Sequence, residues 1–254
     1  MGSRYELPAD ARIRVLTASG TVIVTAEDRT DVEVEPANRT VELKESGSGH
    51  GYGILDHLHR RGRRNPEGRR GQHRFSDDEP PRQSRPVLEV KSKSGSVEVR
   101  CPRGTDVSVG AISGRVNLVG TFGSVKVSTV SGSIEVDTAE GDVDARCVSG
   151  SITVKSCGGR CDVTSKSGRV RVERVDGAAH ASTISGGVEL GTSGRGEVEL
   201  KMVSGGAKVR VLETKHPRVR FQSLSGKMHC ECEQGSDFDL KVRSISGSLE
   251  VTGE

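Results

Sequence analysis

The chain has 254 residues, with 33 glycines, no tryptophan, two tyrosines and four phenylalanines, and its formal net charge is +3. A core of this size normally contains several large aromatic anchors, so the composition predicts a thin core of aliphatic side chains. No run of about 18 apolar residues occurs, which excludes a transmembrane helix, and the first residues contain no apolar signal core. We therefore expect a cytoplasmic protein, with the cell envelope as the alternative if an export signal has been removed.

The N-terminal region contains three stretches of alternating polar and apolar residues, which indicate β-strands. They are residues 12–24, 31–36 and 40–45. We expect residues 1–45 to form N-terminal β-strands that start the fold described below.

Residues 46–86, called the Arg-rich segment here, interrupt this pattern and carry a net charge of +4. Their Gly, Arg, Pro and Ser content cannot bury enough apolar surface to fold alone, so we expect a disordered insert. Such an arginine run binds anionic surfaces or nucleic acid through phosphates. The candidate residues for a weak site of this kind are Arg60, Arg61, Arg63, Arg64, Arg69, Arg70 and Arg74. A merely solvated segment is the favoured alternative.

From Gly114 to Gly186 a glycine recurs every nine residues, and every second one follows a serine, so the full repeat has 18 residues. The positions two and four after each glycine are apolar, as in Ile134 and Val136, and their neighbours are mostly polar. A fixed period of this kind marks stacked repeats, and period-two alternation marks half-buried strands. We therefore predict residues 87–254 to form a parallel β-solenoid (β-helix) of 18-residue coils, right-handed rather than left-handed. A β-sandwich is the alternative, but it does not explain the strict phase.

The residue two positions before each Ser-Gly glycine is also apolar in most repeats, which predicts a further apolar column. Its members are Ile112, Val130, Val148, Ile184, Val203, Leu224 and Ile245, with Lys166 as the exception.

No set of residues predicts catalysis, a cofactor or a metal. Asp142 and Asp144 are an isolated pair and not the repeated cage of a calcium-binding β-roll. Cys157 and Cys161 would supply only two of the four ligands that a structural zinc site needs. The phase of the repeat instead places Cys161 and Cys230 in core columns. The six cysteines show no disulfide-framework spacing, so reduced thiols are expected. The serines recur at every turn, whereas a nucleophile would not.

The repeated stretches VSGSIEV (residues 130–136), EGDVDA (140–145) and VSGSITV (148–154) resemble the bacterial "putative-adhesin" family of β-strand-repeat proteins. The resemblance covers residues 11–35 and 87–254. It implies a β-solenoid and a role that is largely undefined, with some members linked to the cell envelope and its stress responses. The family offers no catalytic motif.

The last repeat ends on an ordinary coil, so Leu249 and Val251 are predicted to be covered on one side only and to form a docking end. The larger residues Phe221, Met228 and Phe238 gather near this end. We expect a non-enzymatic scaffold or interaction module, related to the cell envelope, that binds a protein partner or itself through this end. The alternatives are a self-assembling structural protein similar to bactofilins and, less favoured, a polysaccharide-acting enzyme.

Overall fold

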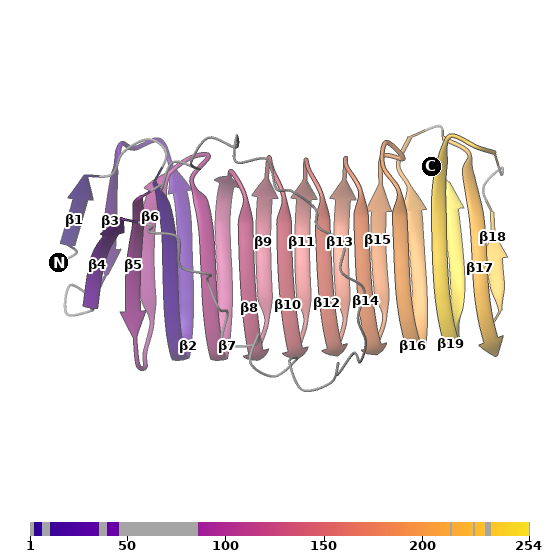
Figure 1. The fold of residues 1–254 in the computed structure, drawn as a ribbon, viewed down its shortest axis with the longest axis horizontal. Helices are drawn as coiled ribbons and strands as arrows, with labels where there is room; N and C mark the ends of the chain where they lie inside the picture. The colour runs from indigo at the N-terminus through magenta and orange to yellow at the C-terminus, as the bar shows by residue number, and fades with distance from the viewer. Residues whose placement is uncertain are drawn as a thin grey trace, which may run out of the picture.

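The computed structural model describes residues 3–6, 11–35, 40–45, 86–213, 215–225, 227–231 and 235–253. These residues form nineteen β-strands and no helix, standing side by side in one elongated stack (Figure 1). The predicted all-β class is confirmed. The described part of the chain accordingly has no helix capable of crossing a membrane. Of the Arg-rich segment only Pro86 is described, so the predicted arginine site lies outside the described residues.

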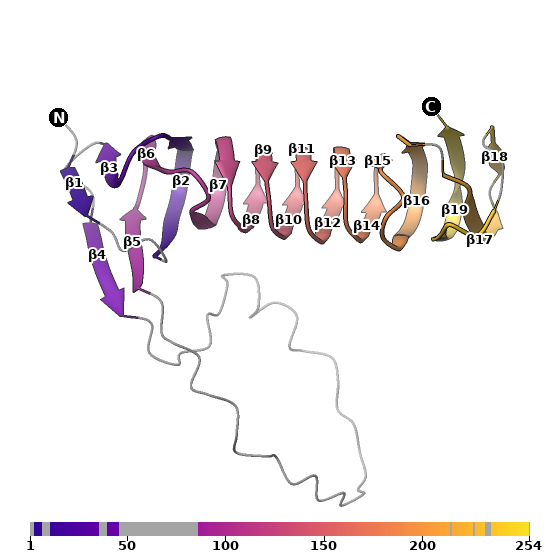
Figure 2. The ribbon, with the colours of Figure 1, turned by 90° about the horizontal axis from the view of Figure 1, so that it is seen from above.

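The middle of the stack consists of short strands that alternate between two layers (Figure 2). The first layer contains β8 (Val125–Ser131), β10 (Val143–Ser149), β12 (Cys161–Ser167) and β14 (Ala179–Ser185). The second layer contains β9 (Ile134–Ala139), β11 (Ile152–Cys157), β13 (Val170–Val175) and β15 (Val188–Thr192). Pairing within each layer is parallel, and Ile134 lies between Val116 and Ile152 as predicted. One turn of the chain thus contributes one strand to each layer.

The core lies between the two layers and is built of the predicted aliphatic columns. Ile134, Ile152 and Val170 are at most 1% exposed, as are most inward-facing residues of the neighbouring strands. Burial of each such side chain contributes about 1.5–3 kcal/mol. Phe122 is a rare large aromatic within this core.

Two kinds of corner join the layers, and they need glycine for different reasons. At the Ser-Gly corners the glycine has a positive φ, for example +139° at Gly150, where a Cβ atom would lie 1.8 Å from the carbonyl oxygen of Gly132. At the other corner, Gly141 has no positive φ, but a Cβ would lie 2.8 Å from the Ser124 hydroxyl. Glycine therefore recurs every nine residues because, at both kinds of corner, successive coils lie too close together for a side chain to fit between them.

The predicted apolar column beside the Ser-Gly corner is not a buried column. Ile112 is 45% exposed, Ile184 is 50% exposed and Leu224 is 86% exposed. These residues come directly before the corner serine, where the alternation of the strand turns their side chains away from the core. The column is therefore a row of exposed or partly exposed apolar side chains along one edge of the stack.

At the N-terminal end, the first long strand does not form the first coil. Strand β2 (Arg12–Glu27) pairs in parallel with β5 (Pro86–Ser92) and β6 (Val97–Pro102) on one side and with β7 (Asp106–Phe122) on the other. Three antiparallel pairings then close this end of the stack. They involve β1 (Ser3–Glu6), β3 (Asp31–Glu35) and β4 (Thr40–Glu45), and they leave β1 and β4 outermost.

The C-terminal end corrects the predicted docking residues. Strand β19 (Phe238–Gly253) lies between β16 (Val198–Val211) and the pair β17 (Pro217–Ser225) and β18 (Met228–Cys230). Leu249 pairs with Ala207 on one side and with Met228 on the other, and Leu249 and Val251 are 1% and 0% exposed. The prediction that these two residues form the open end is wrong, because the last strand folds back between two earlier coils.

Candidate functional site

The open end of the stack is the coil made by β17 and β18. Within the described part of the chain these strands pair with β19 alone (Figure 1). Their inward-facing Val219 and Phe221 are only partly buried against the core, and Met228 is 44% exposed. An edge strand presents backbone N–H and C=O groups that can pair with a further strand. Among the described residues, the end therefore combines a strand edge that has no further strand beside it with apolar side chains that are only partly covered.

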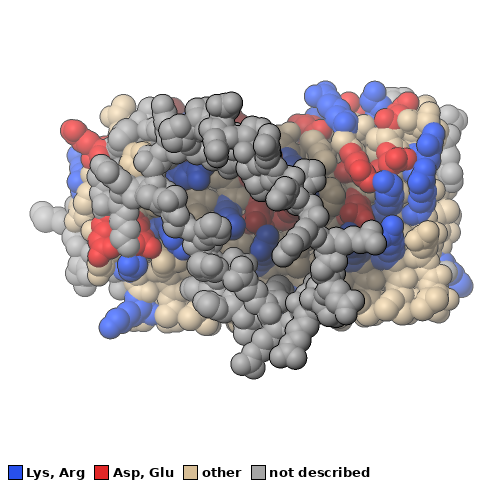
Figure 3. Space-filling view, viewed as in Figure 1, with Lys and Arg blue, Asp and Glu red and all other residues tan. Residues whose placement is uncertain are grey.

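The outer side of this end coil is basic. Arg218 and Arg220 are exposed on β17, and neither forms an ion pair with another described residue. Arg220 is in register with Lys241 on β19, which itself binds Glu197 at 2.5 Å. Figure 3 shows Lys and Arg side chains, with acidic ones between them, over the surface near this end. Arg218 is in register with Asp239 on β19. An acidic partner edge would meet two exposed guanidinium groups here.

The opposite end of the stack carries acidic side chains on the outermost strand β4 and on β3, which lies between β1 and β6. Glu42 of β4 is exposed, and its carboxylate lies 3.7 Å from the Lys91 ammonium. On β3, Asp31 and Glu33 surround Arg29, with the Arg29 Nε 2.9 Å from Asp31 Oδ1. That hydrogen bond lowers the pKa of Asp31, which keeps the carboxylate charged. The exposed Glu42 on β4 and the exposed Arg218 and Arg220 on β17 thus carry opposite charges at the two ends.

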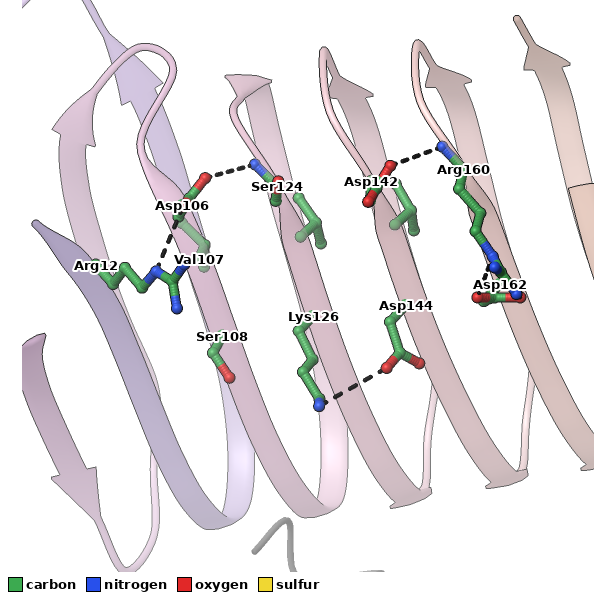
Figure 4. Close-up of a pocket in the computed structure, with 12 residues that line it drawn as sticks. Arg12, Asp106, Val107, Ser108, Ser124, Lys126, Asp142, Asp144, Arg160 and Asp162 are labelled. Atoms are coloured by element: carbon green, nitrogen blue, oxygen red, sulfur yellow. Dashed lines mark hydrogen bonds and ion pairs between the residues drawn. The ribbon is translucent and has the colours of Figure 1, made fainter. Parts of the chain in front are cut away.

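A hollow of about 400 Å³ on the outer face of the first layer is the second candidate (Figure 4). Its charged side chains neutralise one another along the stack. Arg12 lies 3.4 Å from Asp106, Lys126 lies 3.8 Å from Asp144, and Arg160 lies 2.8 Å from the adjacent Asp162. Opposite charges on neighbouring strands stabilise a sheet, and this arrangement contains no paired nucleophile and base.

The calcium and zinc candidates of the sequence have other partners. Asp142 accepts a hydrogen bond from the backbone N–H of Arg160 at 2.8 Å, and Asp144 binds Arg146. Within the described residues no group of three or more His, Cys, Asp or Glu side chains is arranged to hold a metal. Cys161 is buried as the phase predicts, Cys230 is partly buried, and Cys232 lies outside the described residues.

Sequence reasoning missed β17 and β18 as the open end, although one signal was available. The period lengthens after Val211, so that Val219 pairs with Leu240, which is 21 residues on. An irregular spacing near a chain end indicates that the coil order changes there. The exposed Arg218 and Arg220 are a second signal, because a strand with no coil beyond it tolerates an uncompensated charge.

Comparison with known proteins supports the resemblance drawn from the repeats. Residues 86–197 match the family model described as Toastrack DUF4097, a domain of unknown function. Among solved structures, a "putative cell adhesion protein" from Clostridium sporogenes aligns over 100% of both chains with 6% sequence identity and a TM-score of 0.29. That likeness is too low to carry an argument. No match is found among curated protein sequences.

Proposed function

We propose that the protein, whose residues 86–197 match the Toastrack DUF4097 family model, is a non-enzymatic β-solenoid scaffold that assembles end to end with copies of itself. The observation that carries the proposal is the open coil of β17 and β18, with its partly covered apolar side chains and unpaired strand edge. This coil lies beyond the residues that match the family, so the assembly is proposed for this chain and not for the family.

The proposed occupant of the open coil is the N-terminal end of a second copy. Both ends have the same two-layer cross-section, with β17 and β4 outermost in one layer and β18 and β1 outermost in the other. Pairing of β17 with β4 of the next copy would continue the sheet in the antiparallel direction. It would also bring Arg218 and Arg220 towards Glu42, so that charge and hydrogen bonding favour the same contact.

Repetition of this contact would give an open, linear assembly, because the two surfaces involved are different and do not close on themselves. The charge balance of the outer face supports a structural role rather than catalysis. The acidic side chains of the hollow are engaged by Arg12, Lys126 and Arg160, which leaves no carboxylate pair there with an evident acid–base function.

Light scattering over a range of protein concentrations tests the proposal. The wild type should grow in mass with concentration, and Met228→Lys should remain monomeric because it places a charge on the uncovered apolar end. Ile184→Lys is the matched control, since Ile184 is equally exposed (50%) but lies on the edge of the middle coils. A wild type that stays monomeric, or a control that blocks assembly as well as Met228→Lys does, would contradict end-to-end assembly.

A charge exchange identifies the second surface. Arg220→Glu and Glu42→Lys should each weaken assembly, because contacts between like copies then pair equal charges. An equimolar mixture of the two should assemble again, because both contacts between unlike copies pair opposite charges. Circular dichroism should show that both variants are folded. If the mixture stays monomeric while the wild type assembles, the occupant is not the β4 edge and the head-to-tail arrangement is wrong.

A further inference from the structure

Two cysteines face each other across one corner of the stack. Cys157 is the last residue of β11 and Cys161 is the first residue of β12. Both side chains point into the core and are 0% and 1% exposed. In the neighbouring coils the equivalent pairs are Ala139 with Val143 and Val175 with Ala179, which are also buried. Ala and Val therefore fill these core positions in the neighbouring coils, so packing there does not require a cysteine.

The backbone between the two cysteines holds them in a narrow turn. A Cβ atom on Gly158 would lie 2.4 Å from the carbonyl oxygen of Glu140, and one on Gly159 would lie 2.4 Å from the Asp142 carboxylate. The glycines thus let the corner pack directly on the coil before it. The Cys157 Sγ lies 3.6 Å from the carbonyl oxygens of Gly141 and Gly159, which places it at the inner side of this turn.

The two thiols also interact with each other. The Cys161 thiol donates a hydrogen bond to the Cys157 sulfur, which lowers the pKa of Cys157 and, together with burial, raises that of Cys161. Burial alone acts in the opposite direction on other core cysteines, raising the pKa of Cys101 to about 12 and raising that of Cys147. A thiol with a lowered pKa supplies the thiolate, which is the reactive form.

We propose that Cys157 and Cys161 are a redox-active dithiol, which a peroxide converts into a disulfide that closes this corner. The Cys157 thiolate attacks one oxygen of hydrogen peroxide, the O–O bond breaks, and a sulfenic acid and hydroxide form. The Cys161 sulfur then attacks the Cys157 sulfur, and the S–OH oxygen leaves as water with the proton from Cys161. In total, two thiols and one peroxide give one disulfide and two waters.

The burial of both thiols sets the expected kinetics. Neither sulfur is open to solvent at rest, so the oxidant must reach the pair during local opening of the corner. Oxidation should therefore be slower than that of an exposed thiol and faster under mild denaturation. It should need no rearrangement of coils, because the pair already lies within one turn.

Peptide mapping tests the proposal on the full chain. The protein is treated with hydrogen peroxide, unfolded without reductant in the presence of an alkylating agent, and digested with trypsin, which cleaves after Lys155 and Arg160. The reduced protein gives two separately alkylated peptides, residues 156–160 and 161–166. The oxidised protein should give the same two peptides joined, and the whole chain should lose the mass of two hydrogens. Separate peptides after peroxide treatment under mild denaturation, where the corner opens, would overturn the proposal.

Variants separate the pair from the remaining cysteines. Cys157→Ala and Cys161→Ala should each abolish the linked peptide, whereas Cys147→Ala should leave it unchanged. In Cys161→Ala, a sulfenic-acid probe such as dimedone should label Cys157, because no partner resolves the intermediate. Circular dichroism should show that these variants fold, as expected for positions where neighbouring coils carry Ala. Labelling of Cys161 in Cys157→Ala with none of Cys157 in Cys161→Ala would show that the assigned roles are wrong.

Discussion

Truncation of Leu249 and of Met228 to alanine provides a direct test of the coil order at the C-terminal end. The two residues are in register on neighbouring strands, but Leu249 is 1% exposed and Met228 is 44% exposed. Leu249→Ala should lower the free energy of unfolding by about 2–5 kcal/mol, the usual loss for a buried leucine that leaves a cavity. Met228→Ala should lower it by about 1 kcal/mol, because roughly half of the side chain is already in water.

Urea unfolding followed by circular dichroism measures both values, and equal denaturant slopes would show that the compared states are the same. Val251→Ala and Cys230→Ala form a second pair in register, with 0% exposure for Val251 and partial exposure for Cys230. If the chain instead ended on the outermost coil, the Met228 truncation would cost more than that of Leu249. An equal or larger loss for Met228→Ala would therefore refute the inserted position of β19.

Three further predictions concern the corners, the core thiols and the Arg-rich segment. Gly150→Ala should destabilise the fold by more than the about 1–2 kcal/mol of a positive φ alone, whereas Gly104→Ala, with φ +74° and open space, should stay within that range in urea titrations. Burial raises the pKa of Cys101 to about 12. The free energy of unfolding is therefore unaffected by this thiol below its usual pKa of about 8.5 and falls as the pH rises from there towards 12. Cys101→Val should reduce this alkaline loss in the same urea titrations. Deletion of residues 47–84 should leave the melting temperature within a few degrees and remove salt-sensitive binding to heparin, and unfolding on deletion would show that the segment belongs to the core.

The central coils could be predicted from the sequence because residues one sequence repeat apart are also the residues that pair between neighbouring strands. A residue such as Ile134 contacts its counterparts one period away, Val116 and Ile152, so that one repeat in the sequence defines one contact in space. The residues before the corner serine are assigned to a column by their apolar character and not by the alternation of the strand. Ile184 is apolar, but the alternation of β14 places Thr183 inward and Ile184 outward, and Ile184 is 50% exposed.

The candidate site was less predictable, because columns of similar side chains pair equally well in any coil order. The inward positions of β19 would fit against almost any other coil, and long connections add little to the entropy cost of bringing strands together, about 0.6 kcal/mol for each doubling of length. Chain order therefore does not determine which coil is outermost. The choice depends on how much apolar surface each candidate end would leave in water.

The amount of apolar surface left in water explains which strands are outermost at both ends of the stack. Strand β19 presents Leu240 and Leu249 to the core, whereas the coil of β17 and β18 presents Val219 and Met228 at the matching positions. Placing β19 inside buries the two leucines on both sides and leaves Val219 and Met228 at the end, with Arg218 and Arg220 on the outer face of β17. At the other end, β2 is buried between two coils in the same manner and short antiparallel strands are outermost. Those antiparallel strands change the direction of the sheet edge, whereas β17 continues the parallel direction of its neighbours. An edge strand of either direction can accept a further strand, so Arg220 on β17 and Met228 on β18 are the residues whose substitution tests the C-terminal edge.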